Sequence, residues 1–128
     1  MAPIRIETAT LLNAVSINTG QTSAYAPTHG MNQLMLEIDY TYSAATSWSF
    51  QIEQGDGTTA RILAHEEEGA SGTRNIYART YKYTTGGADI NLALPIQILA
   101  EQFRIKNFLA VGGDASDVVT VRLLKAAV

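Results

Sequence analysis

Residues 33–42 read QLMLEIDYTY, and apolar or aromatic side chains alternate with polar ones, with Met35 as the one apolar member of the polar set. Every second residue is apolar or aromatic, namely Leu34, Leu36 and Ile38 followed by two tyrosines. Successive side chains of a β-strand point to opposite faces, whereas a helix would spread these apolar residues around its circumference. The stretch is therefore predicted to be a strand with one buried face.

The segment that follows alternates in the same way. Its apolar set is Trp48, Phe50 and Ile52. The tryptophan is therefore expected in the core. Residues 43–46 have a length that suits a hairpin connection, and Gly55-Asp56-Gly57 suits a tight hairpin turn because Asp-Gly accepts positive φ angles. Residues 33–65 are predicted to form an antiparallel meander.

Further strands are expected on both sides of this meander. They are residues 8–18, 73–85, 89–94, 103–109 and 118–125. Residues 66–72 are acidic and contain glycine, which predicts a loop. Pro95 cannot donate to a hydrogen-bond ladder and is expected to end a strand, and residues 95–102 are compatible with one short helical turn.

About eight short strands separated by Gly, Asp and Ser are typical of an all-β, antiparallel β-sandwich with a jelly-roll-like arrangement. The 128 residues suit one domain. We expect residues 8–128 to form this single β-sandwich domain and residues 1–7 to form an N-terminal arm. The sequence shows no secretory signal and no apolar run long enough to span a bilayer, so no membrane partner is expected.

The composition argues against several classes of function. The formal net charge is −3 and the nine Lys and Arg residues are scattered, so no nucleic-acid partner is expected, because such binding needs a clustered basic surface. The absence of cysteine excludes disulfides and thiolate metal sites. Charged residues make up 16% of the chain, below the roughly 25% of ordinary soluble domains, which favours a surface packed against neighbours.

No catalytic centre is predicted. Residues 69–72, GASG, lack the spacing of a nucleophile elbow and are interpreted as a turn. No glycine-rich phosphate-binding motif is present. Three carboxylates are interpreted as solvated groups on polar strand faces rather than as a glycosidase-type pair, namely Glu37, Asp39 and Glu53. We therefore expect a protein that is not an enzyme and uses no cofactor.

Metal binding is not expected either. His29 and His65 lie far apart, and neither has a second histidine at ligand spacing. Residues 65–68, HEEE, form the densest polar cluster, and carboxylate oxygens of this kind suit Ca²⁺. Because no coordinating spacing is met, we interpret the cluster as a solvated loop.

The last expected strand, residues 118–125, is apolar on both faces. Val118 and Leu124 lie opposite the set expected in the core, and Phe108 similarly lies opposite Leu109 in alternation. A strand of a two-layer sandwich needs only one apolar face. The second face is therefore covered either by a neighbouring subunit or by the N-terminal arm.

The strand expected over residues 73–85 carries Tyr77, Tyr81 and Tyr83 on one face, with Arg79 among them. These side chains suit a sugar-binding face or a subunit interface, and the combination of tyrosine with arginine favours the interface. The complete set of candidate interface residues is Pro3, Ile4, Ile6, Tyr77, Arg79, Tyr81, Tyr83, Phe108, Val118 and Leu124.

The order of these segments resembles the small β-sandwich proteins of tailed-bacteriophage virions, especially the capsid decoration (cement) proteins. The resemblance covers residues 8–125 and is carried by residues 34–42, 48–53, 55–59, 90–96, 103–106 and 118–125. It implies a non-enzymatic structural protein, made in the host cytoplasm, that binds the outer surface of the assembled capsid and stabilises it.

The partners implied by the resemblance are further copies of the chain, with a homotrimer favoured, and the major capsid protein or other virion proteins. An N-terminal arm containing Pro3, Ile4 and Ile6 would extend onto a neighbour by strand addition. Two alternatives stay open. One is another phage structural component, such as a tail, neck or fibre adaptor, and the other is a carbohydrate-binding β-sandwich module.

Overall fold

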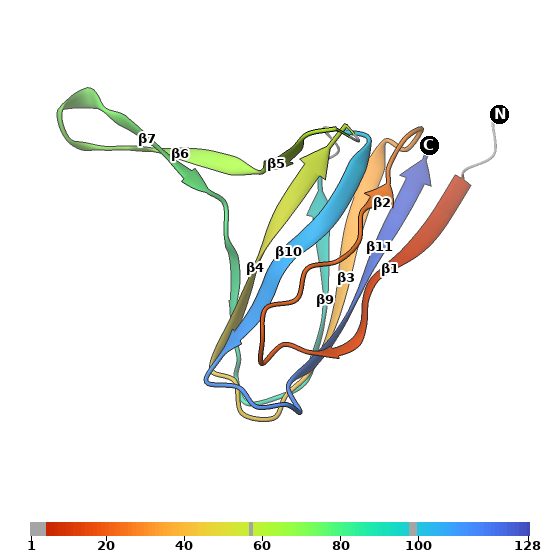
Figure 1. Ribbon diagram of the computed structural model, residues 1–128, viewed down its shortest axis with the longest axis vertical. Coiled ribbons are helices and arrows are strands. Elements are labelled where there is room, and N and C mark those ends of the chain that lie inside the picture. The colour runs from red at the N-terminus through yellow and green to blue at the C-terminus, as the bar shows by residue number, and fades with distance from the viewer. Residues whose placement is uncertain (1–4, 57, 98–99) are drawn as a thin grey trace.

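The computed structural model describes residues 5–56, 58–97 and 100–128. Over these residues the chain consists of eleven strands and one 3₁₀ turn, and every strand pair is antiparallel. The predicted all-β, antiparallel, sandwich-like fold is confirmed. Figure 1 shows the strands arranged in two layers, from which one hairpin projects.

The first sheet contains both the earliest and the latest strands of the chain. Its order is β1 (Arg5–Ser16), β11 (Val118–Ala127), β3 (Gln33–Thr41) and β9 (Ile90–Ile96). Because β11 and β3 lie in the middle of this sheet, their alternating sequences place one apolar set against the other layer.

The second sheet packs face to face with the first, as seen in Figure 1. Its order is β2 (Ala26–Pro27), β10 (Gln102–Val111), β4 (Ser47–Gly55) and β5 (Ala60–Ile62), with β8 (Tyr81–Thr84) paired to the other half of β4. β4 is therefore the strand around which this layer is built.

The core lies between the two sheets and is formed by the alternating side chains predicted to be buried. Its fully or almost fully buried members include Leu36, Ile38, Tyr40, Trp48, Phe50, Ile52, Phe103, Ile105, Val119, Val121 and Leu123. The Trp48 ring centroid lies 6.2 Å from that of Phe50 and 6.0 Å from that of Tyr40. Aromatic pairs at such distances contribute about 0.5–1.5 kcal/mol beyond the area that they bury.

The predicted meander over residues 33–65 is only partly present. β5 returns antiparallel to β4, as expected. β3 and β4, however, belong to different sheets, so the hairpin predicted at residues 43–46 is wrong. The backbone N–H groups of Ser43, Ala44 and Ala45 donate to the Asp117 carboxylate, which holds this connection as a crossing between the layers.

The largest correction concerns residues 64–78, here called the projecting hairpin. The loop expected at residues 66–72 is only partly present, because residues 66–68 belong to β6 (Ala64–Glu68), which pairs with β7 (Arg74–Ala78) around the 3₁₀ turn η1 (Ala70–Gly72). The single strand expected over residues 73–85 is also wrong, since it is divided into β7 and β8 by two residues outside any strand. Figure 1 shows this hairpin leaving the sandwich next to β5.

The region around Pro95 also differs from expectation. Pro95 lies inside β9 and pairs with Met35. β9 is an edge strand of its sheet, which is where proline is tolerated within a strand. The helical turn predicted over residues 95–102 is absent from the part of it that the structure describes, where Ala100 and Glu101 form a bend before β10. Ile98 and Leu99 lie outside the described residues.

Candidate interaction surfaces

The two most buried carboxylates have structural partners. Asp117 is fully buried and accepts hydrogen bonds from the Tyr40 hydroxyl at 2.5 Å and from the backbone N–H groups of Ser43, Ala45 and Asp114. Burial by itself would raise the pKa of Asp117, but these hydrogen bonds outweigh it and hold the pKa far below its usual range. Burial and the bond to Asp117 raise the pKa of Tyr40. The charged carboxylate therefore joins two loops at one end of the sandwich.

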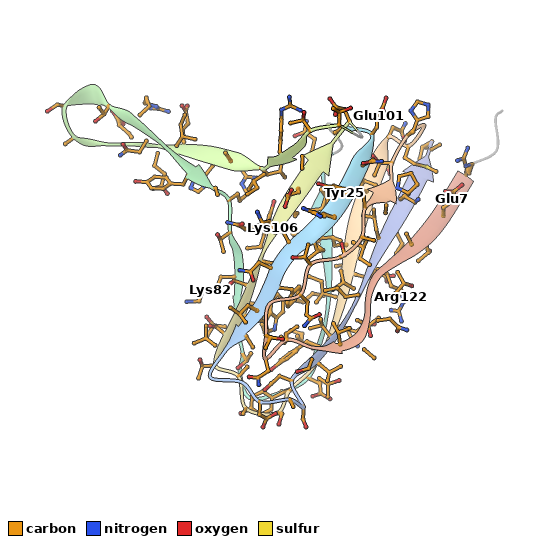
Figure 2. The ribbon with its side chains drawn as sticks, in the orientation of Figure 1. Glu7, Tyr25, Lys82, Glu101, Lys106 and Arg122 are labelled. Atoms are coloured by element: carbon orange, nitrogen blue, oxygen red, sulfur yellow. The ribbon has the colours of Figure 1, made fainter. Side chains whose placement is uncertain are left out.

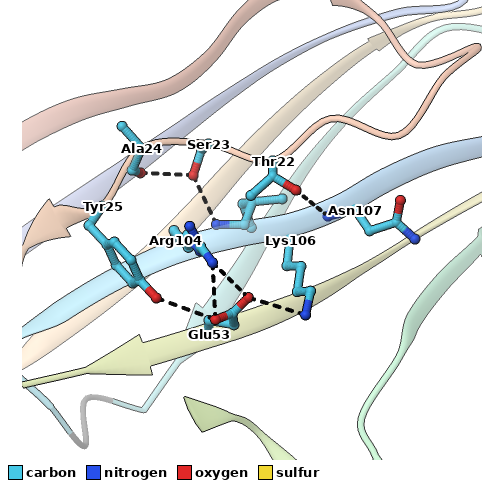
Figure 3. Close-up of polar contacts among 9 residues, drawn as sticks. Thr22, Ser23, Ala24, Tyr25, Glu53, Arg104, Lys106 and Asn107 are labelled. Carbon is cyan, nitrogen blue, oxygen red and sulfur yellow. Dashed lines mark hydrogen bonds and ion pairs between the residues drawn. The ribbon is translucent and has the colours of Figure 1, made fainter. Parts of the chain in front are cut away.

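Glu53 is the second such carboxylate, and its interpretation as a solvated group is wrong, since it is only 4% exposed. Its cross-strand neighbour Arg104 contacts both carboxylate oxygens at 3.1 and 3.2 Å, Lys106 approaches at 3.5 Å, and the Tyr25 hydroxyl donates at 3.3 Å. Figure 3 shows this cluster on the second sheet. Burial would raise the pKa of Glu53, but Arg104, Lys106 and Tyr25 together lower it.

The Glu53 cluster also holds the segment before β2 along the edge of β10. The Arg104 guanidinium lies 4.5 Å from the centroid of the Tyr25 ring. The Ser23 hydroxyl accepts the N–H of Ile105 at 3.0 Å, and the Thr22 hydroxyl accepts the N–H of Asn107 at 3.1 Å (Figure 3). An unpaired strand edge invites pairing with other chains, so this segment closes one edge of the second sheet.

Elsewhere the described part of the chain offers little chemistry. No group of three His, Cys, Asp or Glu side chains within it is placed to hold a metal ion. His65 belongs to the polar cluster of residues 65–68 and lies on the projecting hairpin. Its Nε2 atom is 3.4 Å from a carboxylate oxygen of Glu67. Among the described residues, no helix is long and apolar enough to cross a membrane.

The outer face of the first sheet carries an apolar groove at one end. Thr8, Leu124, Met35 and Pro95 are successive cross-strand neighbours on β1, β11, β3 and β9. A groove of about 590 Å³, here called the outer groove, is lined by Leu124, Met35 and Pro95 together with Ile6 and Ala126. Met35 is 37% exposed and Ile6 is 67% exposed, so the groove presents apolar surface to its surroundings.

The projecting hairpin is the second exposed apolar surface. Ile76 is 77% exposed and Tyr77 is 45% exposed. The hairpin is a two-stranded sheet of its own, and its base is closed by the Arg79 N–H, which donates to the Leu63 carbonyl at 2.8 Å. Figure 2 shows its side chains standing clear of the sandwich. A lone two-stranded hairpin is at best marginally stable in water.

The ten candidate interface residues fall into three groups. Five are at least partly exposed: Ile6 and Leu124 at the outer groove, Tyr77 and Arg79 on the projecting hairpin or at its base, and Val118 at the other end of β11. Three contribute to the core: Tyr81, Tyr83 and Phe108. Pro3 and Ile4 lie outside the described residues.

Phe108 was expected on an outward face and is instead fully buried, so it cannot contact a partner in this fold. The pairing of β10 with β4 shifts register between Lys106 and Leu109, and Asn107 has a φ of 51°. This bulge adds one residue to β10 and turns the Phe108 side chain inward, where its ring centroid lies 4.9 Å from that of Trp48.

The three tyrosines do not share a face. The Tyr81 ring stacks on Phe50 at 5.2 Å and the Tyr83 ring lies 5.1 Å from Trp48, whereas Tyr77 contacts His65 on the projecting hairpin. The common face expected for this set, as a subunit interface or as a sugar-binding face, is therefore not formed.

The N-terminal arm was one of two covers considered for the second apolar face of β11. Arg5, Ile6 and Glu7 belong to β1 and pair with Ala127, Ala126 and Lys125. Figure 1 shows β1 beside β11 in the same layer, so these three residues extend the sheet and do not lie over its outer face. That face, with Val118 and Leu124, is partly exposed.

Comparison with known proteins supports the fold. No protein-family model matches the chain, and no curated protein matches its sequence. The crystal structure of the SPBc2 prophage-derived protein YomS is similar to it, with a TM-score of 0.54 at 12% sequence identity. The match covers 98% of this chain and 96% of that one. The likeness shows a shared fold over almost the whole length of both chains.

Proposed function

We propose that the chain is a structural protein of a tailed-phage virion that binds the outside of the capsid and stabilises it without catalysing a reaction. The observation that carries the proposal is the pair of exposed apolar surfaces, the projecting hairpin and the outer groove, on a sandwich whose core is otherwise well packed. The fold shared with a prophage-derived protein supports a phage origin.

The mechanism follows from burial of these surfaces. Each square ångström of apolar surface removed from water contributes about 25 cal/mol, and a standard protein interface buries about 800 Å² on each partner. A protein that spans the joint between two shell subunits adds such an area at each joint. Separation of the subunits under internal pressure then requires that area to be exposed again.

The test is to locate the chain in intact particles of the phage or prophage that encodes it, by electron microscopy with a labelled copy. Density on the outer shell, together with a higher temperature of DNA release than in particles lacking the chain, is the expected result. Density confined to the tail, neck or fibres would overturn the capsid role and support the alternative structural component.

A binding measurement gives the same proposal a second test. Purified protein is added to shells assembled without it, and the bound fraction is measured by sedimentation. The Val111→Glu variant is the matched control, because Val111 is 58% exposed and belongs to neither apolar surface. Wild type and control are expected to sediment with the shell, and failure of the wild type to do so would contradict the proposal.

A further inference from the structure

We infer that residues 64–79, which are the projecting hairpin and Arg79, form an insertion into a single edge strand of the sandwich. The sandwich folds without this insertion, and the hairpin pivots on the sandwich about Leu63 and Thr80. Both properties belong to the chain itself, so they do not depend on the surface that the protein binds.

β5 and β8 lie on the same edge of β4. The other edge of β4 is occupied by β10 from Ser47 to Gly55. β5 pairs antiparallel with residues 53–55 and β8 with residues 47–50, so β5 and β8 run in the same direction. The Leu63 N–H donates to the Ile52 carbonyl at 3.0 Å and extends the pairing of β5 by one residue. Gln51 is the one residue of β4 that separates the two paired stretches.

The two stretches share one register apart from a fixed number of extra residues. Leu63 lies opposite Ile52, and Tyr81 lies opposite Phe50. These positions are two residues apart on β4 and eighteen residues apart on the other strand, which leaves 18 − 2 = 16 extra residues. They are residues 64–79.

An even number of inserted residues also preserves which side chains face the core, because successive side chains of a strand alternate. Leu63 and Tyr81 both pack against the core. If Thr80 followed Leu63 directly, it would lie opposite Gln51 and face outward between them. β5 and β8 therefore keep both the register and the alternation of one unbroken strand.

The insertion contributes no buried side chain to the sandwich. None of the side chains of β6 and β7 is buried. Their described contacts lie within the hairpin, such as the 2.8 Å ion pair of Arg74 with Glu66 and the ring contact of His65 with Tyr77. Removal of the insertion therefore exposes no core, and a shorter connection costs less chain entropy to close.

The root of the hairpin has the features of a hinge. Leu63 on one side, and Arg79 and Thr80 on the other, lie outside any strand. The backbone bonds described at the root are that of Leu63 to Ile52 and that of the Arg79 N–H to the Leu63 carbonyl, at 2.8 Å. Hinges are typically a few residues at the ends of elements, which absorb the change in backbone angles.

The surroundings of the root leave room for movement. Two hollows of about 530 and 340 Å³ both border Leu63 and Ala64. The larger extends toward Glu101 and the smaller toward Pro95. Figure 1 shows the hairpin directed away from both sheets. The hairpin can therefore change its angle to the sandwich without displacing a packed side chain.

Two deletions test the insertion. Removal of residues 64–79 joins Leu63 to Thr80 in the register of one strand. Removal of residues 64–78 is the matched control, because it leaves one extra residue and so either turns Tyr81 and Tyr83 outward or forces a bulge.

The first deletion is expected to unfold at the wild-type temperature or above it, and the control at a clearly lower temperature. The fluorescence of Trp48, the only tryptophan in the sequence, follows both transitions. Failure of the 64–79 deletion to fold, or equal unfolding temperatures for the two deletions, would overturn the insertion.

Spin labels test the pivot. The sequence contains no cysteine, so introduced cysteines are the only labelled sites. Ala70→Cys at the tip of the hairpin is paired with Val111→Cys on the sandwich, and Met35→Cys with Val111→Cys is the control pair within the sandwich. Val111 and Met35 are both exposed, at 58% and 37%.

Pulsed electron paramagnetic resonance is expected to give a broader distance distribution for the pair that includes the hairpin tip than for the control pair. Equal widths would overturn the pivot. Neither experiment involves a capsid, so a wild type that fails to bind shells would contradict the proposed function and leave these results unchanged.

Discussion

Two antiparallel strand pairs in this chain share a hydrogen-bonding pattern and differ in how far their side chains are buried. β3 and β11 are aligned over nine residue pairs, and Leu36 and Leu123, which face each other across this pair, are fully buried. β6 and β7 are aligned over five pairs, and none of their side chains is buried. Backbone hydrogen bonds alone add little net stability to a ribbon in water. The comparison teaches that burial of side chains supports the pairing of β3 with β11, whereas no such burial within the described residues supports the pairing of β6 with β7.

The largest expected effect comes from removing a ring on the buried side of this comparison. Phe108→Ala leaves a cavity beside Trp48 and Phe50, and is expected to lower the free energy of unfolding by about 3–5 kcal/mol. Ile76→Ala on the hairpin is expected to change it by less than about 0.5 kcal/mol in the monomer. Urea unfolding followed by tryptophan fluorescence measures both. Equal effects would mean that the hairpin packs on the sandwich.

Asp117 gives the next largest effect. Asp117→Asn removes the charge that accepts the Tyr40 hydroxyl and several loop N–H groups, and is expected to cost about 2–3 kcal/mol. Asp114→Asn is the control, because Asp114 is exposed and its carboxylate accepts bonds only at the surface, from the Ser43 hydroxyl and the Ser116 N–H, so a smaller loss is expected. Urea unfolding at neutral pH checks the pair, and an equal loss in both variants would contradict the central role of Asp117.

The same carboxylate predicts how stability depends on pH. The pKa of Asp117 is lowered in the folded state, so its stabilisation is complete above the unfolded pKa of about 3.9 and is lost as the pH falls toward the folded value. The difference in unfolding free energy between wild type and Asp117→Asn is therefore expected to be constant from pH 7 to about pH 5 and to shrink below about pH 4. A difference that grows on acidification would reverse the assignment.

A smaller contrast separates a buried ion pair from an exposed one. Glu53→Gln leaves Arg104 and Lys106 without their counter-charge, and is expected to cost about 1–3 kcal/mol. Glu66→Gln breaks the 2.8 Å contact with Arg74 on the projecting hairpin, and is expected to cost less than about 1 kcal/mol. Thermal unfolding at low and high salt checks both, since screening weakens the exposed pair more.

The smallest effect concerns the backbone of the hairpin. The amides of β6 and β7 are expected to exchange with solvent far faster than those of β3 and β11, because no buried side chain holds the hairpin together. Hydrogen exchange detected by mass spectrometry makes the comparison. Equally slow exchange in the two strand pairs would mean that the hairpin is held by contacts beyond its own backbone pairing.

Periodic segments were predicted correctly because a strand with one buried face records its burial in its own sequence. Residues 34–40 and 48–52 show this, and their apolar sets do form the core. The projecting hairpin was missed because β6 and β7 are exposed on both faces and carry no such alternation. Its charged and glycine-containing stretch has the composition of a loop.

The errors at single residues have tertiary causes. Phe108 was misplaced because one extra residue in β10 changes which side chains face inward, and no local pattern marks that bulge. Glu53 was read as solvated because its cover comes from Tyr25 and Arg104, which lie far from it along the chain. The crossing at residues 43–46 depends on Asp117, which lies more than seventy residues away.

The sequence by itself determined that this protein is built of strands and which side chains of most strands are buried, since both follow from alternation over neighbouring residues. Only the tertiary structure decided that β3 and β4 lie in different sheets, that residues 64–78 leave the sandwich as a hairpin, and that an apolar groove is left on the first sheet. The physical reason is that periodicity is a property of adjacent residues, whereas strand pairing, bulges and exposed surfaces are set by contacts between segments distant in the chain.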